Sequence, residues 1–205
     1  MNIAVLVSDK GTGSNLLAIL EAGFQVKLVI ADSQDAPGIK IAKHKKIAYK
    51  VLPYLKPKDL EITEYRDQYS KKIGEILSEN KIDIAILAGL NRILTKPYFE
   101  TFSQTTINIH PGAIPDRRDE PFLFEDGTIA PWNKGMMTEA AVANFLPLKF
   151  ATSTIHVVTE EADFGPILKR VFVRVEPDDS VKTLYAKLKL AEHEGLIEVL
   201  RNPPL

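Results

Sequence analysis

The residues of this chain best suited to chemistry are an amide, an imidazole and a carboxylate. Asn108 and His110 close a strand-like apolar stretch, and Asp163 lies in a later acidic turn. Side chains alternate along a strand, so Asn108 and His110 should share one face. The trio suits attack on a carbonyl carbon, because Asn108 can donate to a developing oxyanion, His110 can carry a proton and Asp163 can hold His110 in one charge state.

An α/β fold would bring these residues to one edge of a sheet. Apolar stretches such as residues 3–7 are typical of strands buried on both faces, and helical patterns such as residues 61–80 alternate with them. This alternation predicts an open, mostly parallel, twisted Rossmann-like sheet with helices on both faces and an antiparallel C-terminal strand. Ligands of such sheets bind at the carboxyl ends of the strands, where Asn108 and His110 are expected.

The order of the predicted elements can be read along the whole chain. The expected strands are residues 3–7, 26–31, 48–52, 84–88, 105–109, 153–158 and 167–175. The expected helices are residues 16–20, 36–45, 61–80, 97–102, 138–146 and 180–200, the last capped by Asp179 or Ser180. Residues 111–135 have no clean period and predict a long loop, which in a compact domain is usually functional or mobile.

Composition narrows the classes of protein that remain. The chain has 205 residues, 45% of them hydrophobic, which fits one large α/β domain. Its net charge of -1 argues against a nucleic-acid binder. It has no cysteine, and its four histidines lack zinc-ligand spacing, so we expect no metal. Residues 1–8 indicate a buried strand and not a signal peptide, and no stretch is long enough to span a membrane, so a soluble cytoplasmic protein is expected.

Two further regions carry residues that could bind a ligand. Gly11 and Gly13 precede a helix, where backbone amides attract phosphate, although a plain tight turn with Ser14 or Asn15 as helix cap explains the pattern equally well. Lys189 and Glu192 are spaced to share a helical face, which in isolation favours an ordinary surface ion pair. Arg92 could be structural or could face a ligand, and His156 in a β-rich stretch is more often a core residue than a catalyst.

With these residues in view, the chain resembles the folate-dependent formyltransferase family. The matching segments are Gly13-Ser14-Asn15-Leu16, Leu87-Ala88-Gly89 with Arg92-Ile93-Leu94, Asn108-Ile109-His110-Pro111, Thr154-Ile155-His156-Val157-Val158, Asp163 with Gly165-Pro166, and Lys189-Leu190-Ala191-Glu192-His193. They occur in the order of the family and cover nearly the whole chain except the segment after His110. Each is weak alone, and together they are fairly specific.

The resemblance implies a single formyltransferase domain over residues 1–205, with a nucleotide-substrate half (1–105) and a folate and catalytic half (106–205). It implies transfer of a formyl group from 10-formyltetrahydrofolate to the primary amine of glycinamide ribonucleotide in purine synthesis, by a monomer or homodimer. The implied roles are as follows: catalysis by Asn108, His110 and Asp163; binding of the ribonucleotide by Gly13, Ser14, Asn15, Lys189 and Glu192; and binding of folate by Leu90, Arg92, Ile93, Leu94, Ala162, Phe164 and Gly165.

The chain departs from the family pattern in three places. Its first loop, residues 8–13, is longer than the commonest version. Phe164 stands where a small residue is usual, which predicts a differently shaped folate loop. Residues 111–135 replace a short Ser-Leu-Leu-Pro stretch and border the expected site, so this departure bears on the identity of the formyl acceptor more than on the type of reaction. The segment could be a lid that brings Arg117, Arg118 or Trp132 near a ligand. The preferred interpretation is that its charged residues are solvated and that one aromatic residue, Trp132, anchors it.

Other functions remain open at this point. The acceptor could be a different amine, such as a sugar nucleotide, whereas a methionyl-tRNA acceptor is disfavoured by the absence of an appended C-terminal domain and of basic excess. Water could replace the amine and make the protein a hydrolase, although the hydrolases of the family carry an extra N-terminal domain. The same sheet could also form a non-catalytic nucleotide- or folate-binding module, against which the complete set of Asn108, His110 and Asp163 argues.

Overall fold

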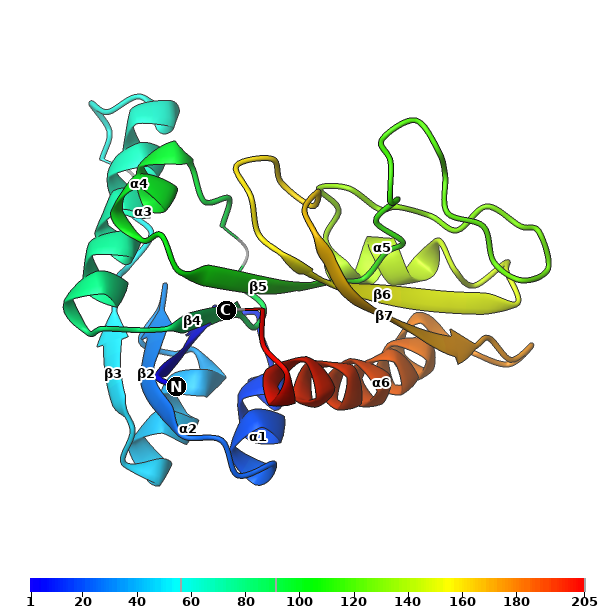
Figure 1. Ribbon diagram of the computed structural model, residues 1–205, viewed down its shortest axis with the longest axis horizontal. Coiled ribbons are helices and arrows are strands. Elements are labelled where there is room, and N and C mark those ends of the chain that lie inside the picture. Colours follow the sequence, from blue (N-terminus) through cyan, green and yellow to red (C-terminus); the bar gives the residue numbers. More distant parts are fainter. Residues whose placement is uncertain (56, 91, 205) are drawn as a thin grey trace. The chain divides into compact units, whose positions relative to one another are not determined.

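A computed structural model describes residues 1–55, 57–90 and 92–204 (Figure 1). Within these residues the elements are β1 (Ile3–Val7), α1 (Ser14–Glu21), β2 (Val26–Ala31), α2 (Pro37–Lys45), β3 (Ala48–Val51), α3 (Ile62–Glu79), β4 (Ile84–Leu87), α4 (Lys96–Thr101), β5 (Thr105–His110), α5 (Thr138–Ala143), β6 (Phe150–Val157), β7 (Ile167–Arg174) and α6 (Val181–Arg201). Every predicted helix and strand is present, with ends shifted by a few residues.

The predicted fold class is confirmed. The strands follow the order β3-β2-β1-β4-β5-β6-β7 in one mixed sheet. The pairs β1–β2, β1–β4 and β2–β3 are parallel, and β6–β7 is antiparallel. The chain divides into two compact units after Ile107, within β5. The assignment of residues 1–105 and 106–205 to two halves of one formyltransferase domain stays a prediction.

The first unit, residues 1–107, is built around β1. All five residues of β1 are buried, because strands pair on both of its edges and other elements cover its faces, and this explains its continuous apolar sequence. Gly38 of α2 allows a close approach to the strand, since a Cβ there would lie 2.8 Å from Val7 Cγ2. Tyr65, Tyr69, Ile73, Ile76 and Leu77, predicted as the apolar face of α3, are all buried.

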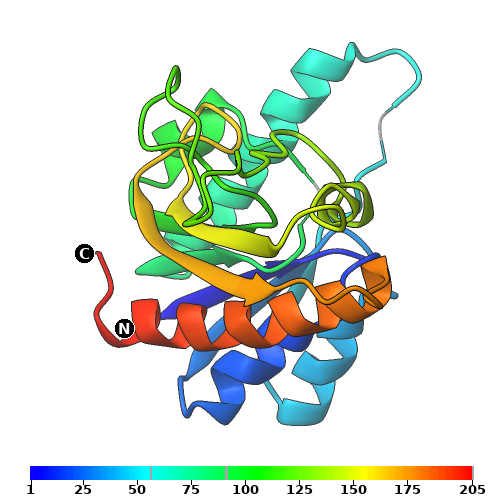
Figure 2. The same ribbon diagram turned by 90° about the vertical axis from the view of Figure 1, so that its right-hand side faces the viewer.

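The second unit, residues 108–204, packs α6 against the β6–β7 pair (Figure 2). Ser180 begins α6 with a capping box, in which its hydroxyl accepts from the backbone of Thr183 while the Thr183 hydroxyl accepts from the Ser180 backbone. This confirms Ser180, one of the two predicted caps. A buried apolar cluster that includes Phe124, Phe145 and Leu188 forms the core of the unit.

The unusual segment, residues 111–135, is part of this core and contains no helix or strand. Its only regular pairs in the described chain are the isolated bridges Arg117–Glu120 and Leu123–Ile129. Ala113, Phe124 and Ala130 are nevertheless buried in the core cluster. The segment is therefore anchored by its own apolar side chains, while its charged residues 116–120 are exposed.

Candidate active site

His110 and Asp163 form an ion pair in the second unit. His110 ends β5, Asp163 lies in the turn between β6 and β7, and His110 Nδ1 is 3.3 Å from Asp163 Oδ1. Burial by itself raises the pKa of Asp163, but the hydrogen bond and charge of His110 and the Gly135 N–H outweigh burial, so the pKa is lowered. Asp163 is therefore a carboxylate at neutral pH, and the prediction that it lies against His110 is confirmed.

The other nitrogen of His110 is also occupied. His110 Nε2 lies 2.6 Å from the backbone carbonyl oxygen of Trp132. A carbonyl and a carboxylate can only accept, so both ring nitrogens must carry protons for both contacts to be hydrogen bonds. Both contacts are therefore satisfied together only by the positively charged imidazolium form of His110.

Asn108 is oriented by a second histidine, His156 of β6. His156 Nδ1 donates to the carbonyl oxygen of Val157 at 3.0 Å, so in the neutral ring Nε2 is an acceptor. The Asn108 amide nitrogen lies 3.3 Å from this Nε2 and donates to it. Burial lowers the pKa of His156 to about 4, so the ring is neutral near pH 7. One N–H of the Asn108 amide is thus engaged, and the second can point to a ligand.

The turn that carries Asp163 has a constrained backbone. Asp163 has a φ of 50°, a left-handed conformation that few residues other than glycine adopt readily. Gly165 closes the turn against β6, since a Cβ there would lie 2.1 Å from the Val157 carbonyl oxygen. Only glycine fits this approach, which is the physical reason for the Gly165-Pro166 bend that marked the turn in the sequence.

Two of the three residues of this turn predicted to bind folate line a pocket. Phe164 and Gly165 contribute to a cavity of about 460 Å³ that also includes Pro115, Asp116, Thr159, Glu161, Pro166 and Ile167. Ala162 is partly buried and is not among the residues that line it. No contact here tests a folate role for Ala162, Phe164 or Gly165, which stays a prediction.

Glu192 and Lys189 of α6 do not form a simple surface ion pair. Glu192 is only 3% exposed and accepts a hydrogen bond from Ser153 Oγ at 2.6 Å. Burial raises the pKa of Glu192, against the effects of Ser153 and Lys189. Lys189 lies over the ring of Tyr185 at 4.5 Å, and burial lowers its pKa. The surface interpretation was wrong because the polar side chain of Ser153, contributed by β6, gives Glu192 a buried partner that helical spacing alone does not reveal.

In the first unit, the predicted phosphate loop lies between β1 and α1. Gly13 is the N-cap of α1 with a φ of 75°, and no side chain caps this helix. The alternative with Ser14 or Asn15 as helix cap is therefore wrong, because the helix already includes Ser14. Asn15 Oδ1 is buried without a hydrogen-bond partner among the described residues, so an acceptor is available at the start of the helix. Binding of a phosphate by Gly13, Ser14 and Asn15 stays a prediction.

The predicted folate segment of the first unit follows β4. Arg92 pairs with the buried Asp32 at 2.7 Å and lies over the ring of Tyr54 at 4.3 Å, so it has structural partners. Leu90 and Leu94 are buried, whereas Ile93 is 55% exposed. Asn91, which falls inside the predicted segment, lies outside the described residues. A folate role for Leu90, Arg92, Ile93 and Leu94 stays a prediction.

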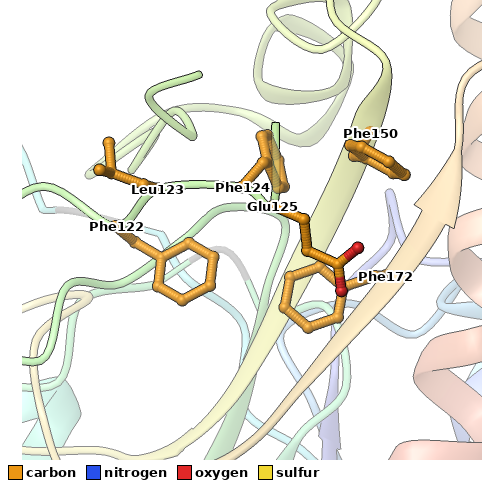
Figure 3. Close-up of a pocket in the computed structure, with 6 residues that line it drawn as sticks. All are labelled: Phe122, Leu123, Phe124, Glu125, Phe150 and Phe172. Carbon is orange, nitrogen blue, oxygen red and sulfur yellow. The ribbon is translucent and has the colours of Figure 1, made fainter. Parts of the chain in front are cut away.

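Two other observations concern ligands. Among the described residues there is no group of three or more His, Asp or Glu side chains that could hold a metal ion. The second unit also has an apolar pocket of about 270 Å³. Figure 3 shows that the carboxylate of Glu125 lies beside an aromatic ring of this pocket. Its lining residues are Phe122, Leu123, Phe124, Glu125, Phe150 and Phe172, and none of them belongs to the predicted site.

His156 and Trp132 are the site residues that sequence reasoning undervalued. His156 was interpreted as a core residue, and it is 1% exposed, but it also holds the Asn108 amide. Trp132 is the expected anchoring aromatic, but its backbone contact with His110 could not be found from the sequence.

Membrane spans were expected to be absent from the sequence. In the part of the chain that the structure describes, no helix combines the length and the apolar character that a membrane span needs.

Comparison with known proteins agrees with this architecture. The family model described as "Formyl transferase" matches residues 1–200, so the chain belongs to the formyl transferase family. It is 29% identical over 217 residues to phosphoribosylglycinamide formyltransferase of Dictyostelium discoideum, an alignment that covers 98% of this chain and 96% of that protein. The crystal structure of glycinamide ribonucleotide transformylase 1 from Symbiobacterium toebii has a TM-score of 0.75 and 28% identity, and covers 98% of this chain and 86% of that one.

Other relatives are much longer than this chain. The chain is 30% identical over 198 residues to the trifunctional purine biosynthetic protein adenosine-3 of Homo sapiens, which covers 94% of this chain. It spans only 17% of the length of that human protein. The matched region is thus one part of a multifunctional protein in some relatives and nearly the whole protein in others.

Proposed function

We propose that the chain transfers the formyl group of 10-formyltetrahydrofolate to the primary amine of glycinamide ribonucleotide. The observation that carries the proposal is the oriented set of Asn108, His110 and Asp163 in the second unit. The names of the relatives support the acceptor and, through the family, the folate donor. The donor is already activated, so the reaction needs no metal.

The reaction begins with attack of the amine nitrogen on the formyl carbon. A carbon–nitrogen bond forms, and negative charge develops on the formyl oxygen. The free N–H of Asn108 donates to this oxygen, and the imidazolium of His110 stabilises it electrostatically. The tetrahedral intermediate then collapses, the bond from the formyl carbon to the folate nitrogen breaks, and the proton lost by the amine is taken up by that nitrogen.

Asp163 serves the reaction by keeping His110 charged. An opposite charge within hydrogen-bonding distance favours the protonated form of an imidazole. Asp163 can also hold a water that relays the proton from the amine to the leaving nitrogen. Each role needs the carboxylate to be ionised, and the contacts of Asp163 with His110 and Gly135 favour that state.

The two substrates would use the remaining predicted residues. We assign the phosphate of the ribonucleotide to Gly13, Ser14 and Asn15, where backbone amides and the N-terminus of α1 attract an anion. We assign its phosphate and ribose region also to Lys189 and Glu192. Folate would use Leu90, Arg92, Ile93 and Leu94 together with Ala162, Phe164 and Gly165, of which Phe164 and Gly165 already line a cavity.

Three alternatives lead to different measurements. A different amine, such as a sugar nucleotide, would accept the formyl group in place of the ribonucleotide. Water as acceptor would give turnover without any amine. A module that only binds would show affinity for folate or nucleotide without turnover.

The proposal also covers the state and location of the protein. We propose that it acts in the cytoplasm as a monomer or homodimer, and that its partners are small molecules and neither nucleic acid nor membrane.

The test is folate turnover by the purified chain. The protein is mixed with 10-formyltetrahydrofolate, with and without glycinamide ribonucleotide, and deformylation is followed by absorbance. Turnover that requires the ribonucleotide supports the proposal. Equal turnover without any amine would replace it with hydrolysis, and folded protein that binds folate without turnover would leave a binding module.

A further inference from the structure

We propose that the turn Trp132–Gly135, braced by Phe164, is a positioning element for the His110–Asp163 pair. The inference rests on the proposed function for its catalytic consequence. It concerns two of the three places where the chain departs from the family pattern, the segment after His110 and the residue after Asp163. These two departures contact each other, since the rings of Trp132 and Phe164 have centroids 5.6 Å apart.

Three hydrogen bonds connect this turn to the catalytic pair. The Trp132 carbonyl oxygen accepts from His110 Nε2 at 2.6 Å. The Trp132 indole N–H donates to the Asp163 backbone carbonyl at 2.9 Å, and the Gly135 N–H donates to Asp163 Oδ2 at 2.8 Å. One short turn therefore contacts the imidazole, the carboxylate and the backbone that carries the carboxylate.

The turn is itself fixed by a buried asparagine. Asn133 is 6% exposed and has a φ of 59°, a conformation that asparagine tolerates better than most residues. Its amide nitrogen donates to the carbonyl oxygens of Pro111 and Ala141, and its Oδ1 accepts from Asn144. Because every hydrogen-bonding atom of the Asn133 amide is engaged, the turn is held against both neighbouring parts of the unit.

Charged side chains close the outer side of the element. Glu161 accepts from both Arg118 and Lys134, and these contacts lower the pKa of Glu161. Arg118 also lies over the ring of Phe164 at 5.3 Å, and Lys134 over the ring of Trp132 at 4.9 Å. These pairs are partly exposed and contribute little individually, so the directional contacts of Trp132 and Gly135 are the ones that position the pair.

This arrangement explains why Phe164 and the long segment occur together. The ring of Phe164 packs against the Trp132 indole. The same indole donates its N–H to the backbone carbonyl of Asp163, the residue before Phe164. A small residue after Asp163 would leave that side of the indole without this ring contact. The position of Trp132 in turn fixes its own backbone carbonyl, which lies 2.6 Å from His110 Nε2 and accepts a hydrogen bond from the protonated ring. Trp132 is thus a positioning residue, because it acts through His110 and Asp163.

The test uses Trp132→Phe, which keeps an aromatic ring and removes the indole N–H. Loss of one hydrogen bond to the Asp163 backbone should lower kcat roughly three- to tenfold, with KM for each substrate changed less. The Gly135 amide reports Asp163 without any need for activity. In wild-type protein its NMR shift should follow ionisation of the carboxylate, and in the variant the midpoint should move to higher pH. The groups that face Asp163 in this titration are His110, His156 and the Gly135 N–H itself.

A matched control is Tyr98→Phe in the first unit, which removes a buried hydroxyl 2.6 Å from Thr106 Oγ1. Tyr98→Phe should lower the free energy of unfolding by about as much as Trp132→Phe does, without moving the midpoint of the Gly135 amide titration. An unchanged midpoint and unchanged kcat in Trp132→Phe would overturn the inference. If Trp132→Phe does not fold, Phe164→Leu should produce a smaller shift of the same sign, and no shift would count against the proposal. If the wild-type protein does not transfer formyl groups, the proposed function is wrong. The titration of the Gly135 amide would still show whether Trp132 positions Asp163.

Discussion

Two aspartates with cationic partners, one in each unit, differ in what their partners can do. In the first unit, Asp32 lies 2.7 Å from a nitrogen of Arg92. In the second unit, Asp163 lies 3.3 Å from His110 Nδ1. A guanidinium never releases its proton at accessible pH, whereas an imidazolium can. Similar electrostatic pairing therefore gives a permanent structural contact in one unit and a group suited to chemistry in the other.

The surroundings of the two carboxylates reinforce this difference. Asp32 also accepts from the backbone of Asp9 at 3.3 Å and is 1% exposed at its side chain. The side chain of Asp163 is 18% exposed and belongs to a turn held by Trp132 and Gly135. Partial exposure beside a titratable partner is what a catalytic carboxylate needs, because substrate and water must reach the pair.

The largest expected effect comes from Asp163→Asn. The change preserves shape and removes the charge that favours the imidazolium of His110, so kcat should fall roughly 10²- to 10⁴-fold. Steady-state kinetics with both substrates would measure this. Asp179→Asn is the control, since Asp179 pairs with Lys187 at 2.7 Å in the same unit and has no contact with His110 among the described residues. If folded Asp163→Asn kept a kcat near that of the wild type, the carboxylate of Asp163 would not be needed for catalysis, and the contrast with Asp32 would fail.

The next effect is on stability and concerns His156. Its pKa is lowered from 6.5 to about 4 by burial, so between these values the unfolded chain binds more protons than the folded chain. Stability should therefore fall as the pH decreases through this window, by roughly 3 kcal/mol in total. Urea unfolding at several pH values would measure the slope. His156→Gln should flatten it and, through its amide oxygen, keep an acceptor for Asn108, whereas His156→Phe should flatten it and lower kcat.

Asp32→Asn should affect stability more than chemistry. Removing the charge that pairs with Arg92 should cost about 2 kcal/mol, because the ion pair with a buried carboxylate is lost while Arg92 stays partly solvated. Chemical denaturation would measure the loss, and the pH dependence of kcat should keep its shape. A changed pH profile would mean that Asp32 is coupled to the chemistry, and the contrast between the two aspartates would fail.

The smallest effect is expected for Gly13→Ala in the first unit. A Cβ at Gly13 would lie 2.6 Å from Ile41 Cδ1, and the φ of 75° adds strain of about 1 kcal/mol. If this loop binds the phosphate, KM for the ribonucleotide should rise while kcat is retained. Gly23→Ala is the matched control, with a φ of 84° and no atom near its added Cβ. A rise in KM shared by both variants would point to a general loss of stability and not to phosphate binding.

Much of the fold could be predicted because its signals are local. The sequence predicts strand β1 with both ends correct, since five consecutive apolar, largely β-branched residues are typical of a strand buried on both faces. The end of α5 was missed: the helix stops at Ala143, before a run of turns that leads to Pro147. Strand β6 begins at Phe150, earlier than predicted, because Ala151 and Thr152 gain buried positions only after pairing with β7.

The candidate site was partly predictable for the same reason. Asn108 and His110 could be placed on one strand end by alternation, and Gly165-Pro166 marked the turn of Asp163. The environment of Glu192 was not predictable, because its buried partner Ser153 comes from another element. Nor could the roles of His156 and Trp132 be found, since both depend on contacts between segments distant in sequence.

The sequence by itself determined the order of strands and helices, the strand-end positions of Asn108 and His110, and the absence of thiol chemistry. These follow from hydrophobic period, turn residues and composition, which act over a few neighbouring residues. Only the tertiary structure decided which acceptors face the two ring nitrogens of His110, the orientation of the Asn108 amide and the partners of the two aspartates. The physical reason is that a proton or an amide responds to the acceptors around it in space, and folding supplies those acceptors from residues far along the chain.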